Sequence, residues 1–63
     1  MTTVNGSPYR PTPGETVQQL IQAQIGRTAG IAVAIDGAVV PKSRWEDTPV
    51  AGDVEIVTAA QGG

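Results

Sequence analysis

The sequence ends in "AAQGG", where Ala60, Gln61, Gly62 and Gly63 follow the last apolar stretch of the chain. A pair of glycines contributes no side chain to a core. Such a tail is either a frayed end without a role, as chain termini often are, or the working part of the molecule. The function of this protein depends on which of these two interpretations is right.

Two acidic pairs are the other candidates for chemistry, Glu46 with Asp47 and Asp53 with Glu55. Paired carboxylates can act as acid and base or bind a cation, but neighbouring acidic residues in turns are usually a solvated face. The chain contains no cysteine and no histidine, so it lacks a thiol nucleophile, an imidazole base and the usual zinc ligands. It also lacks the G-x-x-x-x-G-K-[ST] loop that binds nucleotide phosphates. We therefore expect no catalytic residue and no metal site.

The charged residues argue against a nucleic-acid partner. Six acidic and four basic side chains give a formal net charge of -2, and the basic residues are scattered along the chain. Arg44 stands beside Trp45, but a single basic and aromatic pair is a weak signal for base stacking. A packed Trp45 with a solvated Arg44 is the simpler interpretation.

The length of the chain limits its architecture. Its 63 residues make one domain, and a domain of this size buries about 60% of the surface of the unfolded chain, too little for a large enclosed pocket. The sequence has no basic start followed by an apolar run, and no stretch reaches the about 18 apolar residues of a membrane span. We expect a soluble, cytoplasmic protein that enters no membrane and is a monomer when free.

The first predicted element is a hairpin at Asn5-Gly6, because a two-residue turn needs positive φ at both central positions. Its second strand should be short, irregular and at an edge, since Pro8, Pro11 and Pro13 cannot donate hydrogen bonds to a neighbouring strand.

A helix of about three turns is predicted next, within "PGETVQQLIQAQIG". Thr16 and Gln19 fit a capping box at its start, and Gly26 should end it in a left-handed conformation. Its apolar residues fall on one stripe at positions i, i+3, i+4 and i+8: Val17, Leu20, Ile21 and Ile25.

A second hairpin is predicted over residues 31–40, with a turn at Asp36-Gly37 and an end at Pro41. One helical turn around Trp45 and a last strand, "VEIVT", follow. This order predicts an α+β fold in which one main helix covers one face of a small sheet. The predicted core consists of Val4, Leu20, Ile21, Ile31, Val33, Ile35, Trp45 and Ile56.

The alternation along the predicted strands leaves a modest apolar face toward solvent. Ala32, Ala34 and Val57 fall on the side opposite the core. Such a patch is more often a docking surface than an accident. We expect a folded domain over residues 1–59 and a flexible tail over residues 60–63.

Residues 30–63, "GIAVAIDGAVVPKSRWEDTPVAGDVEIVTAAQGG", resemble the ThiS family, the sulfur carrier proteins of thiamin biosynthesis. That family has a V-A-V-x-x-N-G-x-V-V-P hairpin, a basic residue and Trp, a D-x-V-E-I-V-T strand and a terminal Gly-Gly. The resemblance extends to Asn5-Gly6 and "GETVQQLI", so it covers nearly the whole chain. Two features depart from the family pattern. Asp36 replaces the common Asn, and the proline-rich "SPYRPTPG" is longer and stiffer than the usual second strand, which leaves the geometry of this sheet edge open.

The resemblance implies a β-grasp, ubiquitin-like fold, in which the small sheet is mixed, and a carrier that is not itself an enzyme. The carboxylate of Gly63 would be the modified group, and Ala60, Gln61 and Gly62 would pass through a channel of the partner. A ThiF-like adenylyltransferase would activate the carboxylate with ATP, a persulfide would donate sulfur, and a ThiG-like thiazole synthase would accept it from a thiocarboxylate. The chain itself would bind no cofactor.

Other functions remain open from the sequence. Sulfur carriers of similar fold supply molybdopterin or cysteine synthesis, and similarity of the tail separates these pathways poorly. The chain would otherwise be a non-covalent ubiquitin-like binding module whose diglycine is incidental.

Overall fold

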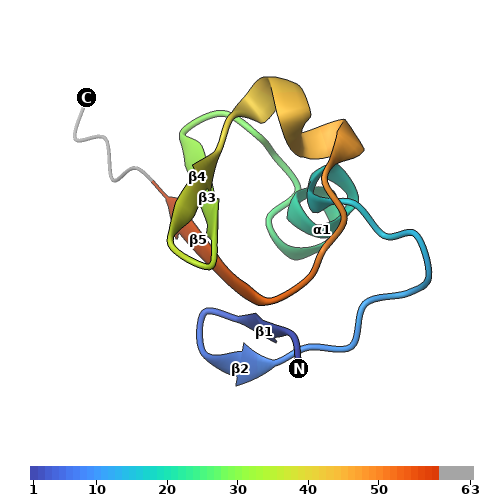
Figure 1. Ribbon diagram of the computed structural model, residues 1–63. Coiled ribbons are helices and arrows are strands. Elements are labelled where there is room, and N and C mark those ends of the chain that lie inside the picture. Colours follow the sequence, from blue (N-terminus) through green and yellow to red (C-terminus); the bar gives the residue numbers. More distant parts are fainter. Residues whose placement is uncertain (59–63) are drawn as a thin grey trace.

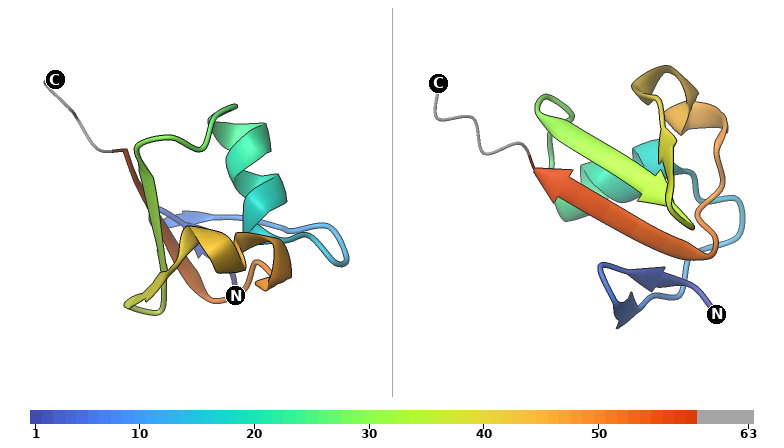
Figure 2. Two further views of the ribbon diagram at one scale, coloured as in Figure 1. Left: turned by 90° about the horizontal axis from the view of Figure 1, so that it is seen from above. Right: turned by 60° about the vertical axis from the view of Figure 1, so that its left-hand side comes forward.

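The computed structural model describes residues 1–58 and shows an α+β fold (Figure 1). The strands form one sheet in the order β2-β1-β5-β3-β4, in which β1 and β5 are parallel and the other neighbours are antiparallel. Helix α1 and the 3-10 helix η1 lie on the same side of this mixed sheet (Figure 2). The predicted fold class is therefore confirmed. The elements are β1 (Thr3–Val4), β2 (Ser7–Pro8), α1 (Val17–Gln24), β3 (Ile31–Ile35), β4 (Ala38–Val40), η1 (Lys42–Asp47) and β5 (Asp53–Thr58).

Both predicted two-residue turns are present. Asn5 and Gly6, between β1 and β2, have φ angles of 51° and 84°. Asp36 and Gly37, between β3 and β4, have φ angles of 51° and 85°. Positive φ at both central positions is the signature of a type I′ turn, whose twist matches that of the flanking strands. Strand β2 is two residues long and lies at the edge of the sheet, as its prolines predicted.

Helix α1 has the predicted caps but is shorter than predicted. The Thr16 hydroxyl accepts the N–H of Gln19 at 3.3 Å, and Gln19 Oε1 accepts the N–H of Thr16 at 3.0 Å. Gly26, with φ of 86°, follows the C-cap. The helix is eight residues long, which is about two turns. Ile25 is 36% exposed, contrary to its predicted place on the buried stripe, because the helix ends at Gln24.

The core fills the space between the sheet and the two helices. Of the eight predicted core residues, five are buried, whereas Val4, Ile35 and Ile56 are half-buried at its margin. Val50 is buried although it belongs to no helix or strand, and its N–H donates to the Glu15 carbonyl at 3.0 Å. The buried hydrophobic residues are Val17, Leu20, Ile21, Ile31, Val33, Trp45, Val50 and Val54.

Trp45 anchors η1 to the core, as predicted. Its side chain is the largest that is fully buried, with 1% exposure. The indole Nε1–H donates to the Val40 carbonyl at 3.0 Å, so the polar end of the ring is paired. Lys42 Nζ lies 5.8 Å from the ring centroid, within the range of a cation–π contact.

The proline-rich segment between β2 and α1 is fastened by a tyrosine and a buried glutamate. The Tyr9 hydroxyl donates to Glu15 Oε2 at 2.6 Å, and the N–H of Thr12 donates to Glu15 Oε1 at 2.9 Å. The hydrogen bond from Tyr9 lowers the pKa of Glu15 although burial acts in the opposite direction. The same hydrogen bond, together with burial, raises the pKa of Tyr9.

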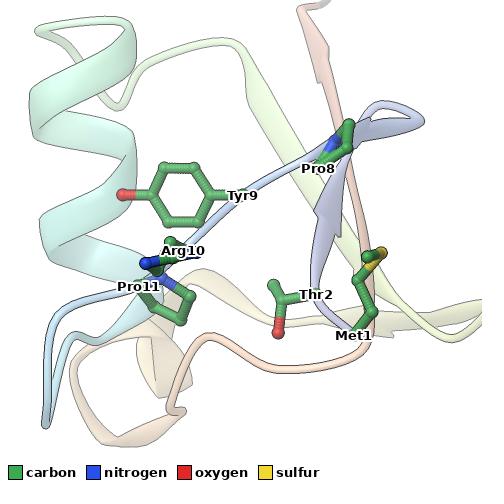
Figure 3. Close-up of a pocket in the computed structure, with 6 residues that line it drawn as sticks. All are labelled: Met1, Thr2, Pro8, Tyr9, Arg10 and Pro11. Atoms are coloured by element: carbon green, nitrogen blue, oxygen red, sulfur yellow. The ribbon is translucent and has the colours of Figure 1, made fainter.

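An open hollow lies along the other side of this segment (Figure 3). Tyr9 directs its hydroxyl toward the helix and away from Met1. The hollow has a volume of about 530 Å³ and is lined by Met1, Thr2, Pro8, Tyr9, Arg10 and Pro11. Within residues 1–58, no helix is long and apolar enough to cross a membrane.

Candidate functional site

Strand β5 leads to the predicted tail from the middle of the sheet. It pairs with β1 on one side and with β3 on the other. Its last residue, Thr58, lies opposite Ile31 of β3. The predicted tail, residues 60–63, and the predicted boundary at residue 59 lie outside the described residues.

The outer face of the sheet, away from α1 and η1, carries the three residues predicted to form a docking surface. Val57 of β5 lies directly opposite Ala32 of β3, and Ala34 is two residues further along β3 on the same face. Val57 is 58% exposed, Ala32 is exposed and Ala34 is half-buried. The structure thus brings these residues together next to the end of β5.

Val39 belongs to the same face, which the sequence interpretation did not recognise. It lies opposite Ala34 in the β3–β4 hairpin and is 76% exposed. The signal for it was present, because a two-residue turn at Asp36-Gly37 fixes the register and places Val39 on the face of Ala34. The adjacent Val40 packs against the core instead. We define the outer patch as Ala32, Ala34, Val39 and Val57.

The outer face becomes more polar with distance from the end of β5. Val57 and Ala32 pair at the end nearest Thr58, whereas Glu55, also exposed, lies opposite Ala34. At the start of β5, Asp53 Oδ1 accepts a hydrogen bond from the Thr3 hydroxyl at 2.9 Å. An incoming partner would therefore meet an apolar surface beside the end of β5 and acidic groups further from it.

The two acidic pairs considered as catalytic or metal sites lie on different elements of the fold. Glu46 and Asp47 are exposed on η1, and Asp53 and Glu55 are exposed on β5. In the part of the chain that the structure describes, no three acidic side chains come close enough to hold a metal ion. The buried Glu15 is fully engaged by Tyr9 and Thr12 as a structural group.

A comparison with known protein families gives a match over nearly the whole chain. A sequence profile described as the ThiS family matches residues 2–63. The chain belongs to the ThiS family. No protein of curated function matches it in a sequence comparison.

Membership of the ThiS family establishes the general role of the protein. ThiS proteins are sulfur carriers of thiamin biosynthesis, and they neither catalyse a reaction nor bind a cofactor themselves. Their partners are of the ThiF and ThiG types. The assignment therefore favours the thiamin pathway over molybdopterin and cysteine synthesis, and a carrier over a non-covalent binding module.

Proposed function

We propose that the carboxylate of Gly63 is the group that carries sulfur. The carboxylate attacks the α-phosphate of ATP on a ThiF-like adenylyltransferase, giving an acyl-adenylate and releasing pyrophosphate. The terminal sulfur of a persulfide donor then displaces AMP, and a thiol reduces the resulting S–S bond to release the thiocarboxylate. A ThiG-like thiazole synthase accepts this sulfur.

The observation that carries this proposal is the family match, which runs through the two terminal glycines. Activation needs a leaving group on the carboxylate, and the described residues hold no group that could supply one. Ala60, Gln61 and Gly62 lead the carboxylate into the partner, and the two terminal glycines let the backbone enter a narrow channel because they have no Cβ. ATP is thus bound by the partner and not by the carrier.

The outer patch supports the proposal, since it offers an apolar contact beside the strand from which the tail continues. The activating enzyme docks on Val57, Ala32 and Ala34, together with Val39. A carrier of this kind acts in the cytoplasm, as a monomer when free, and has no nucleic-acid partner. The scattered basic residues agree with the last point.

The proposal is tested by adding one residue after Gly63. The extension moves the carboxylate about 3.5 Å from the place where it would meet the α-phosphate, so activation should fail. The parent and the extended protein are incubated with a ThiF-like enzyme, ATP and a persulfide donor. Intact mass then reports replacement of an oxygen by sulfur.

A matched control shows that the extension does not act through folding. The extended protein and Gly62→Val should both keep a free energy of unfolding within about 0.5 kcal/mol of the parent, because substitutions outside the core have small effects. A parent that no ThiF-like enzyme converts, or an extended protein converted as fast as the parent, would contradict the proposal.

A further inference from the structure

The first residue of each tight turn is bonded to β5 through its side chain. Asn5 Oδ1 accepts the N–H of Ile56 at 2.8 Å. Asp36 Oδ1 accepts the N–H of Asp53 at 2.9 Å. Both turns therefore bind the same strand at different places. Asp36 binds its first residue, Asp53, whereas Asn5 binds Ile56, two residues before the end of the strand.

The main-chain support of β5 is uneven along its length. Strand β3 pairs with residues 54–58, whereas β1, among the described residues, pairs only with Asp53 and Val54. The N–H of Asn5 donates to the Val54 carbonyl at 2.8 Å, after which the turn carries the chain away to β2. The Asn5 side chain thus supplies the acceptor that a main-chain carbonyl would supply if β1 were longer, and it binds the Ile56 N–H on the side away from β3.

We propose that Asn5 is a positioning residue for sulfur loading. Through its hydrogen bond to Ile56, Asn5 limits the movement of the next two residues of β5. These are Val57 of the outer patch and Thr58, which precedes the tail. This inference rests on the proposed function, in which the activating enzyme binds the outer patch and reacts with the carboxylate of Gly63, five residues after Thr58. A displacement at the origin of the tail changes where the carboxylate arrives, and a misplacement of about 1 Å can slow a reaction about 100-fold.

The two turns supply a matched pair of variants. Asn5→Gly and Asp36→Gly each remove one side-chain acceptor of a β5 N–H, and glycine tolerates the φ of 51° that both positions adopt. The two variants should therefore lose similar stability in a urea titration. Only Asn5→Gly removes support near the tail.

The test measures steady-state thiocarboxylate formation by the activating enzyme as a function of carrier concentration. For Asn5→Gly we expect kcat to fall about fivefold to tenfold, the effect of one lost hydrogen bond, with KM within about twofold of the parent because the outer patch is intact. Asp36→Gly should keep the kcat of the parent. Asn5→Asp retains the acceptor and tolerates positive φ, so it should restore kcat.

Amide hydrogen exchange gives a second measurement that does not depend on the variants folding equally well. In the parent and in Asn5→Asp, the N–H of Ile56 should exchange at least about tenfold more slowly than the N–H of Thr58. An Ile56 N–H that exchanges as fast as that of Thr58 in the parent would overturn the inference.

The kinetic outcomes distinguish this inference from the proposed function. A parent that is not converted at all contradicts the proposed function itself. A parent that is converted while Asn5→Gly and Asp36→Gly show the same kcat contradicts only the positioning role. An unchanged kcat in Asn5→Gly, or no recovery in Asn5→Asp, also rejects the positioning role.

Discussion

Replacing Tyr9 with Phe tests the hydrogen bond that fastens the proline-rich segment. The change removes one hydroxyl group and leaves Glu15, which is 9% exposed, without its shortest hydrogen bond. A hydrogen bond to a charged group contributes about 1.5–3 kcal/mol, so we expect Tyr9→Phe to lower the free energy of unfolding by about 2 kcal/mol at pH 7. At about 0.05–0.15 kcal/mol per residue, this is a large part of the stability of a 63-residue domain.

The pKa shifts give this contribution a defined pH window. The pKa of Glu15 is lowered from 4.5 in the folded protein, so its contribution is complete above that value and is lost as pH falls through the folded pKa. The pKa of Tyr9 is raised from 10.0, so its contribution is complete below that value and is lost as pH rises through the folded pKa. The cost of Tyr9→Phe should therefore be greatest between these two titrations.

The measurement is urea unfolding of the parent and of Tyr9→Phe, followed by the fluorescence of Trp45, from pH 7 down to about pH 2. Protonation of Glu15 leaves a neutral hydrogen bond of about half the strength, so the difference between the two proteins should shrink by about half in acid. In a Glu15→Gln background, where the acceptor is neutral at every pH, the difference should be about half as large and should not change with pH. A Tyr9→Phe cost that is independent of pH, or equal in both backgrounds, would refute the assignment of this stability to the Tyr9–Glu15 pair.

Three further changes test the core, a turn and the outer patch. Trp45→Ala should lower the free energy of unfolding by about 3–5 kcal/mol, and an unchanged melting temperature would show that this side chain is not an anchor. In denaturant titrations, Gly52→Ala should lower the free energy of unfolding more than Gly14→Ala. A Cβ at Gly52 would lie 2.7 Å from Asp36 Oδ2, whereas a Cβ at Gly14 would meet nothing within 4 Å. Equal losses of stability would contradict the contact at Gly52. Val57→Lys should weaken binding to the activating enzyme about tenfold in a titration while the melting temperature changes little, and equal loss of both would place Val57 in the core.

The features predicted correctly from the sequence are those set by residues close together in the chain. Positive φ at Asn5-Gly6 and Asp36-Gly37 follows from the intrinsic freedom of Asn, Asp and Gly. The capping box of Thr16 and Gln19 spans three residues and needs no other part of the molecule. The arrangement of the whole sheet, in contrast, was inferred from the resemblance to a family.

The features missed from the sequence depend on contacts that no periodic pattern records. Tyr9 and Glu15 meet across an irregular segment, where neither helical nor strand spacing predicts a partner. Val50 belongs to no helix or strand, so no periodic pattern predicts its burial in the core. Val39 could have been placed from the register of the predicted hairpin, but the outer face was assigned only to Ala32, Ala34 and Val57.

For the candidate site, the structure places Ala32, Ala34 and Val57 on one face of the sheet, where the alternation of the sequence also put them. Their alternation against buried neighbours is a local property of the strands, so it could be interpreted before the structure was known. Their role in docking and the role of residues 60–63 stay predictions, because both depend on a second protein. The bond from Asn5 to Ile56 joins residues far apart in sequence and was visible only once β1 and β5 were placed side by side.

The central place of β5 has a consequence for how the protein is made. β5 is the last strand within residues 1–58, yet it is the strand that joins the β1–β2 hairpin to the β3–β4 hairpin. A nascent chain that stops before Asp53 lacks the strand that joins the two hairpins into one sheet, so contacts of long sequence separation must wait until β5 has been made. A chain truncated before Asp53 lacks Val57 and the strand that joins the two hairpins, so it cannot form the outer patch.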